Sequence, residues 1–154
     1  MSPSLKKRIV VEIRQIHRLL EVHSGLLSKC KTATPGPDDL AALSAILHSF
    51  YTGLENIFKQ ISKEFDGITI QGPFWHSDLI ESMTIRLPNR PPLLSSSLSE
   101  SLQEYLDFRH VFRQAYSFEL KWDKMAHLVL NLETVFKMFE TECNTFISHG
   151  SADN

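Results

Sequence analysis

The sequence predicts an all-α fold, an antiparallel bundle of four to five helices. Apolar residues recur every three or four positions over four long segments, which is the spacing of one helix face. No segment shows the strict alternation of a half-buried strand, and the breaks between segments are rich in proline, glycine or serine. Because the links are short, consecutive helices are expected to run antiparallel.

The first two helices follow from their apolar stripes. The stripe of the first helix is Ile9, Ile13, Ile16, Leu20, His23 and Leu27. Residues 32–37 then break the chain with two prolines and a glycine. Asp38 and Asp39 suit the first turn of the second helix, because acidic side chains complement the positive end of the helix dipole. Its stripe ends before Gly67 and comprises Leu40, Leu43, Leu47, Phe50, Leu54, Ile57, Ile61 and Phe65.

The middle of the chain has a weaker pattern. Residues 74–86 predict one short helix, and three prolines and three serines after it mark a loop. The third long helix has a capping-box signature, with Ser97 as the N-cap and Glu100 at the third helical position. We expect this helix to run to about Tyr116.

The last helix has the widest apolar surface, which suggests that part of it faces a second subunit. Its apolar residues are Met125, Leu128, Val129, Leu132, Val135, Phe136, Phe139, Cys143, Phe146 and Ile147. A short corner at residues 118–121 precedes it. We expect one helical domain over residues 1–149 and a disordered tail over residues 150–154.

Composition and net charge limit the kinds of partner and compartment that we expect for the chain. The chain has 154 residues and a net charge of −2, so its overall charge does not attract nucleic acid or anionic lipid, and such binding would need a local patch. Two cysteines without CxxC spacing favour a reducing, cytoplasmic compartment. No apolar stretch approaches the ~20 residues of a membrane span. We therefore expect a soluble protein without a membrane partner.

Several common chemistries lack their motifs. The sequence has no phosphate-binding glycine loop, no HExxH pair and no GxSxG elbow. Asp107 and His110 form one Asp-x-x-His step, but metal sites in bundles need several carboxylates from facing helices. The other six histidines lie far apart and are interpreted as surface or partly paired core residues. We expect neither a metal site nor a cofactor.

The third long helix carries an unusual group of residues. At ~100° per residue, Arg109, Arg113 and Tyr116 fall within about 60° of one another. His110 lies about 60° beyond Arg113. Two interpretations remain open for the arginine on this apolar face. Arg109 could pair with Glu55 or another carboxylate of a facing helix, or the group could bind an anion, because guanidinium matches phosphate geometry.

Residues 105–120 resemble the signature helix of HepT-like proteins in the HEPN superfamily. Residues 50–57, Trp75, His76 and residues 90–92 are similar too, so the resemblance covers most of the chain. It implies a HEPN-like helical fold and a small RNase that usually forms a homodimer. It also implies a toxin whose partner is a nucleotidyltransferase antitoxin.

The family motif is an arginine, a polar residue, a spacer, a histidine, one residue and a tyrosine. Arg109 matches the arginine, and His110 matches the polar residue after it. Tyr116 matches the tyrosine, which in this family is the target of AMP transfer by the antitoxin. Gln114 occupies the position of the family's catalytic histidine, and this is where the sequence departs from the pattern.

The resemblance implies metal-independent RNA cleavage, in which arginine stabilises the phosphate and histidine carries protons. Gln114 cannot titrate, so cleavage should be weakened or lost unless His110 substitutes. General acid–base help is worth ~10²–10⁴-fold. We assign RNA phosphate binding to Arg109 and Arg113. The expected catalytic positions are Arg109, His110, Gln114 and Tyr116.

Two other interpretations are kept. The chain could be a non-catalytic helical module that binds RNA, a nucleotide or a partner protein, which the glutamine favours. It could also be a purely structural bundle in which Arg109 forms an internal ion pair. The catalytic interpretation requires that Arg109 and Tyr116 open together into a solvent-accessible pocket shared by paired protomers.

Overall fold

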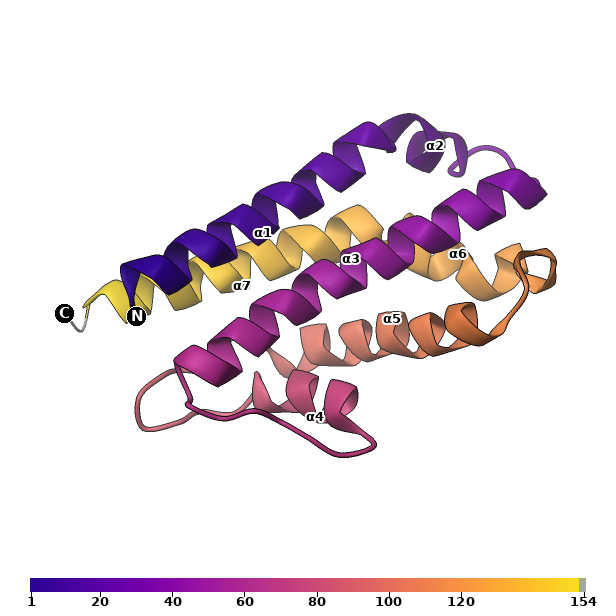
Figure 1. The fold of residues 1–154 in the computed structure, drawn as a ribbon. Coiled ribbons are helices and arrows are strands. Elements are labelled where there is room, and N and C mark those ends of the chain that lie inside the picture. The colour runs from indigo at the N-terminus through magenta and orange to yellow at the C-terminus, as the bar shows by residue number, and fades with distance from the viewer. Residues whose placement is uncertain (153–154) are drawn as a thin grey trace.

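The predicted all-α fold is confirmed by the computed structural model, which describes residues 1–152 as a helical bundle without strands (Figure 1). A single isolated bridge joins Leu87 and Arg90 in the loop before α5. The elements in chain order are α1 (Pro3–Val22), α2 (Ser24–Lys29), α3 (Pro37–Glu64), α4 (Trp75–Ser82), α5 (Ser96–Gln114), the 3₁₀ helix η1 (Ser117–Glu119), α6 (Trp122–Leu130) and α7 (Leu132–Ala152).

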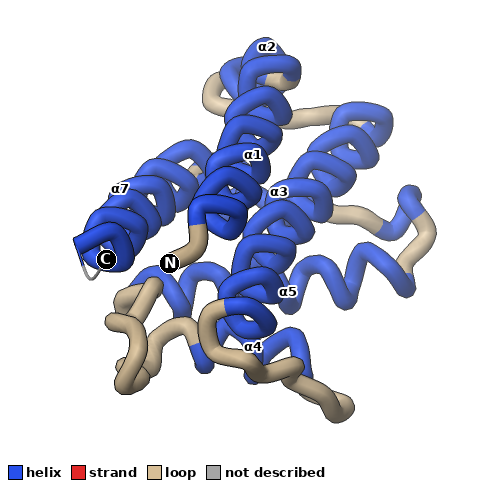
Figure 2. The backbone as a smooth tube through the Cα atoms, turned by 60° about the vertical axis from the view of Figure 1, so that its left-hand side comes forward, coloured by secondary structure: helices blue, strands red, loops and turns tan. Residues whose placement is uncertain are grey.

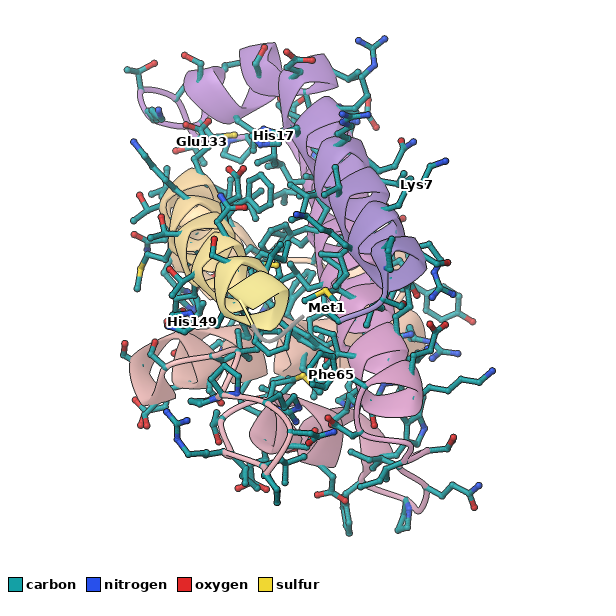
Figure 3. The ribbon with its side chains drawn as sticks, turned by 90° about the vertical axis from the view of Figure 1, so that its left-hand side faces the viewer. Met1, Lys7, His17, Phe65, Glu133 and His149 are labelled. Carbon is teal, nitrogen blue, oxygen red and sulfur yellow. The ribbon has the colours of Figure 1, made fainter. Side chains whose placement is uncertain are left out.

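The longest helix, α3, is the central element of the bundle. It packs against α1, α4, α5 and α6, and also contacts η1 (Figures 1 and 2). The two ends of the chain lie together, because the Met1 ammonium donates a hydrogen bond to the Gly150 carbonyl at 3.1 Å. Figure 3 shows Met1 beside the C-terminal end of α7. α3 therefore lies against both α4 and α5.

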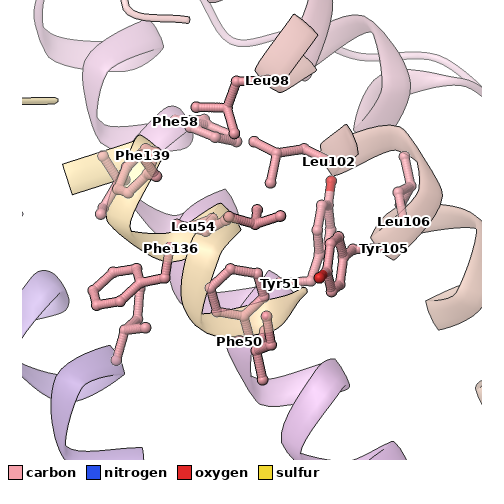
Figure 4. Packing of buried hydrophobic residues seen from close by; sticks show 14 of the residues in the cluster. Phe50, Tyr51, Leu54, Phe58, Leu98, Leu102, Tyr105, Leu106, Phe136 and Phe139 are labelled. Carbon is pink, nitrogen blue, oxygen red and sulfur yellow. The ribbon is translucent and has the colours of Figure 1, made fainter. Parts of the chain in front are cut away.

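Aromatic side chains of α3, α5 and α7 meet in the core (Figure 4). Phe50 packs edge-on against Tyr105 of α5 at 5.3 Å and against Phe136 of α7 at 6.2 Å between ring centroids. The Tyr105 hydroxyl donates a hydrogen bond to the Leu128 carbonyl at 2.7 Å, so this buried polar group is paired and ties α5 to α6. These contacts fix the register of α5 against α3.

Two predicted helices are each divided in the structure. His23 separates α1 from α2, and Asn131 separates α6 from α7. The Asn131 side chain donates to the His127 carbonyl at 2.7 Å, which is a local bond that competes with helix continuation. The predicted helices were right in position, but the apolar periodicity continues across both breaks and does not reveal them.

The predicted ends of α5 are wrong at both termini. The N-cap is Ser95 rather than Ser97, because Ser95 Oγ accepts from the Leu98 amide at 3.3 Å. The Ser95 amide in turn donates to Glu142 of α7 at 2.8 Å, a tertiary contact that favours the earlier start. At the other end Ala115 has an extended backbone, with ψ 146°, so the helix ends at Gln114.

The apolar surface of α7 is used within the protomer. The residues from Leu132 to Ile147 on this face are buried, and among the described large apolar side chains of α7 only Met138 remains exposed. Intramolecular packing therefore explains the width of this face, and the suggested subunit contact on it is not supported. α7 continues to Ala152, past the expected boundary at residue 149, and residues 153–154 of the expected tail lie outside the described residues. In the described residues, every helix is too short or too polar to span a bilayer.

The loop between α4 and α5 is fixed by a buried arginine. Arg90 donates to both carboxylate oxygens of Asp66, at 2.5 and 2.8 Å. Its remaining donors reach the carbonyls of Ser82, Ile85 and Pro91. This network holds the loop against the end of α3 and leaves α4 in a defined position beside α5.

Candidate functional site

A buried carboxylate on α3 is the centre of the candidate site. The Glu55 side chain is 3% exposed. Its Oε2 lies 2.6 Å from His76 Nδ1 of α4 and 3.8 Å from Arg109 Nη1 of α5. Its Oε1 lies 3.4 Å from Lys59 Nζ. We call Glu55, Lys59, His76 and Arg109 the Glu55 cluster.

The Glu55 cluster fixes the orientation of His76. An ionised carboxylate only accepts hydrogen bonds, so Nδ1 of His76 carries a proton and donates to Glu55. Nε2 is then the ring nitrogen that can exchange a proton with a ligand. The Trp75 indole stacks on the imidazole, with ring centroids 3.5 Å apart, and restrains it from the side. The pair of carboxylate and imidazole resembles the oriented base of many hydrolytic sites.

Arg109 points inward and retains unused hydrogen-bond donors. Its side chain is 12% exposed, and its guanidinium carbon lies 5.8 Å from the centre of the Tyr51 ring. Nη1 is 3.2 Å from His76 Nδ1, while Nε is buried with no hydrogen-bond partner in the described part of the chain. A buried donor without an acceptor is costly, so the hydrogen bonding of this arginine is incomplete although it is ion-paired with Glu55.

The neighbouring predicted residues lie on the outer side of α5. His110 is exposed, and its ring lies 6.0 Å from that of His76 in an edge-on arrangement. Arg113 and Gln114 are exposed in the last turn of the helix. The structure therefore brings Arg109 and His110 to the Glu55 cluster, with Arg113 and Gln114 farther along the same helix.

Tyr116 lies outside α5 and faces solvent. Its side chain is 70% exposed and stacks on Phe118 of η1, with ring centroids 5.4 Å apart. The helical-wheel position predicted for Tyr116 is wrong, because the backbone is already extended at Ala115. Within the protomer, Arg109 and Tyr116 have different surroundings, so the expected common pocket is not met there.

Comparison with models of known protein families shows the family to which the chain belongs. The model of the HepT-like protein family matches residues 42–149, which is most of the chain. The chain belongs to this family. The matched region contains the Glu55 cluster and all of α5. Neither the curated proteins nor the solved structures contain a match.

Membership in the HepT-like family indicates a HEPN-type toxin. Proteins of the family are generally part of toxin–antitoxin pairs. In residues 1–152 of this HepT-like chain, no group of three His, Cys, Asp or Glu side chains is arranged to hold a metal ion.

Two further side chains show the electrostatics of the site. Burial lowers the pKa of His48, and the positive charges of Arg109 and Arg113 lower it further, against an opposing effect of Glu55. Burial and the Glu55 carboxylate raise the pKa of Tyr51, so its hydroxyl stays protonated. Burial is the main cause at both residues; among the charged neighbours, the arginines have the larger effect at His48 and Glu55 has the larger effect at Tyr51.

The helical spacing does not predict that His76 lies beside Arg109. The carboxylate of Glu55 was foreseen as a partner for Arg109, and the 3.8 Å contact places the two together. His76 is one of the histidines interpreted as surface or partly paired core residues, and its contact with Glu55 agrees with the second interpretation. Nothing in the helical spacing of α5 points to a residue 33 positions earlier, and only the family similarity of Trp75 and His76 could have identified it.

Proposed function

We propose that this HepT-like protein is a toxin that cleaves RNA around Arg109, His76 and His110. The observation that carries the proposal is the position of the Arg109 guanidinium, 3.2 Å from one imidazole and on the same helix as the other. Attack of a ribose 2′-hydroxyl on the adjacent phosphate needs charge stabilisation and two proton transfers. One guanidinium and two imidazoles meet these requirements.

These three groups can supply the proton transfers and the charge stabilisation of the cleavage. His76 Nε2 takes the proton of the 2′-hydroxyl as the oxygen attacks phosphorus, and the hydrogen bond from Nδ1 to Glu55 supports the imidazolium. The bond from phosphorus to the 5′-oxygen breaks, and His110 supplies the proton for that oxygen. Arg109 donates to the non-bridging oxygens as their charge grows. Gln114 supplies hydrogen bonds but no proton transfer.

RNA turnover by purified protein tests this assignment. His76→Ala and His110→Ala should each lose about 100-fold or more in rate, as expected for loss of an acid or base. Gln114→His should raise the rate, because it restores a titratable group at the family's histidine position. His127→Ala, an exposed histidine on α6, is the matched control and should be unchanged. Equal turnover in all four variants would remove the catalytic assignment.

A non-catalytic binding module is the second candidate. Two observations favour it: Gln114 cannot titrate, and the Glu55 carboxylate already neutralises part of the charge of Arg109. Purified protein that binds RNA or a nucleotidyltransferase but shows no turnover, even as Gln114→His, selects this candidate.

We also infer a homodimer that forms through the corner at the end of α5. Large apolar side chains are exposed there: Val111 is 57%, Tyr116 70% and Phe118 80% exposed. Exposed aromatics gathered in one place are typical of an interface. A dimer would bring two copies of Arg113 close together and create the local positive field that the overall charge lacks. Sedimentation should give a dimer that Phe118→Glu converts to a monomer.

Tyr116 is the proposed site of AMP transfer by a nucleotidyltransferase antitoxin. Its phenol is exposed in the single protomer, so the transferase would reach it before a dimer covers this corner, and Arg113 on the last turn of α5 can contact the phosphates of ATP. The phenol oxygen attacks the α-phosphorus, pyrophosphate leaves, and the phenol proton is lost. The intact mass of protein co-expressed with its transferase should increase by one AMP, and Tyr116→Phe should stay unmodified. Unmodified wild-type protein beside an active transferase contradicts this proposal.

A further inference from the structure

A surface cavity of about 440 Å³ lies directly beside the Glu55 cluster. Its walls are the second half of α3, residues 68–72 and the start of α4. The lining combines the Trp75 indole with the apolar side chains of Ile70 and Leu79 and with two lysines, Lys59 and Lys63. An aromatic face, an apolar floor and two cations suit a ligand that is flat and apolar at one end and anionic at the other.

The loop that closes this cavity is fixed at both ends. Ser62 Oγ donates to the Ile68 carbonyl at 2.8 Å, and the Ile68 amide donates to the Ser62 carbonyl at 2.9 Å. At the other end the Trp75 amide donates to the Gly72 carbonyl at 3.3 Å. Gly72 has φ +110°, a conformation that other residues rarely adopt. The cavity is thus largely preformed, which reduces the cost of ordering it on binding.

Two residues connect the cavity with the Glu55 cluster. Trp75 lines the cavity and stacks on the His76 imidazole. Lys59 lines the cavity and pairs with Glu55 Oε1, whose carboxylate also contacts His76 and Arg109. A ligand that fills the cavity therefore lies next to the groups to which we assign phosphate binding and proton transfer.

We propose that this cavity binds one nucleobase of the RNA strand, next to the phosphate held by Arg109. The proposal rests on the function proposed above and adds the position of a base. Indole rings stack on every base, and lysines bind the flanking phosphates. The strand would pass from the cavity, over Trp75, to the scissile phosphate.

Lys59 and Trp75, which both line the cavity, also contact each other. Lys59 Nζ lies 4.8 Å from the centre of the Trp75 ring, a cation–π distance. A base that stacks on the indole replaces this ammonium. The Lys59 side chain is 48% exposed and can move to a phosphate of the same strand. Base stacking and phosphate neutralisation are coupled through this one lysine.

Binding of a labelled single-stranded RNA with 2′-O-methyl groups tests the proposal, because such a strand cannot be cleaved through its 2′-oxygen. Measured by fluorescence anisotropy, Trp75→Ala should weaken binding about tenfold or more, and Trp75→Phe should recover much of the loss. Lys63→Ala should weaken binding and reduce its salt dependence. Trp122→Phe on α6 is the matched control and should bind like the wild type. Thermal melts monitored by circular dichroism check that each variant is folded.

The outcomes separate this proposal from the proposed function. Cleavage with Trp75→Ala binding equal to the wild type overturns the base site and leaves the function standing. Binding that depends on Trp75 without any cleavage of unmodified RNA supports the base site and overturns the cleavage assignment. Free AMP that competes as strongly as the RNA shows a site for nucleotides rather than for a strand and overturns the proposal. A strand that does not bind at all also overturns it.

Discussion

Arg90 and Arg109 are both withdrawn from solvent, yet their partners differ. The Arg90 side chain is 0% exposed, and all its donor nitrogens meet acceptors, including both oxygens of Asp66. The nearest carboxylate oxygen to Arg109 is 3.8 Å away, and its Nε has no partner in the described residues. The comparison separates a buried arginine whose donors are all paired from one whose pairing is incomplete.

This difference explains why burial alone does not identify a structural arginine. A buried charge is tolerated where it is paired and hydrogen-bonded, and Arg90 meets both conditions. Arg109 is paired with Glu55 at 3.8 Å, but its Nε donates to no acceptor in the described residues. The chain therefore accepts incomplete pairing next to His76, which is where a phosphate would complete it.

The largest effect on stability is expected at Arg90. Arg90→Ala leaves the buried Asp66 carboxylate without its partner and should lower the free energy of unfolding by about 3–5 kcal/mol. Urea denaturation measures this loss. Arg86→Ala, an exposed arginine of the same loop, is the control and should be within about 0.5 kcal/mol of the wild type. Similar losses for the two variants would show that the Arg90 network contributes little.

The largest effect on activity is expected at Arg109. Arg109→Ala should reduce RNA turnover by about 10²–10³-fold, as for loss of one donor that stabilises a transition state. Its loss of stability should stay near 1–3 kcal/mol, because Glu55 keeps His76 and Lys59 as partners. A loss as large as that of Arg90→Ala, without a change in turnover, would make Arg109 a purely structural residue.

A smaller effect concerns pH. The pKa of His48 is lowered in the folded protein, so below its ordinary value of 6.5 the unfolded chain binds a proton that the folded chain resists. Stability should therefore fall as pH decreases through about 6.5, and His48→Gln should make this fall shallower. NMR titration should show a higher His48 pKa in Arg109→Ala, because that guanidinium contributes to the lowering. An unchanged value would place Arg109 too far from His48 to matter.

The sequence was sufficient for the fold class and for one ion pair of the candidate site. Helical spacing predicted the bundle, because each apolar stripe indicates which face of its helix is buried. It also singled out Arg109 and suggested Glu55 as its partner, since an arginine on an apolar face requires a carboxylate. The ion pair at 3.8 Å agrees with that suggestion.

The rest of the site depends on tertiary contacts that do not change the apolar periodicity of the sequence. His76 reaches Glu55 only because the loop after α3 folds back and places α4 against α5. Tyr116 lies outside the helix because the backbone is extended at Ala115. The sequence has no proline or glycine near this position that would predict the end of the helix. Ser95 rather than Ser97 is the N-cap of α5. The Ser95 amide donates to Glu142 of α7, a contact between distant helices that local spacing does not predict.

The bond between the Met1 ammonium and the Gly150 carbonyl has a practical consequence. Both termini lie at the end of the bundle away from the corner between α5 and α6, as Figures 1 and 2 show. A purification tag or surface tether joined at either terminus would leave that corner free for the second protomer of the proposed dimer. Of the two attachment points, the C-terminal one is preferable, because an N-terminal extension converts the ammonium to an amide and removes its charge.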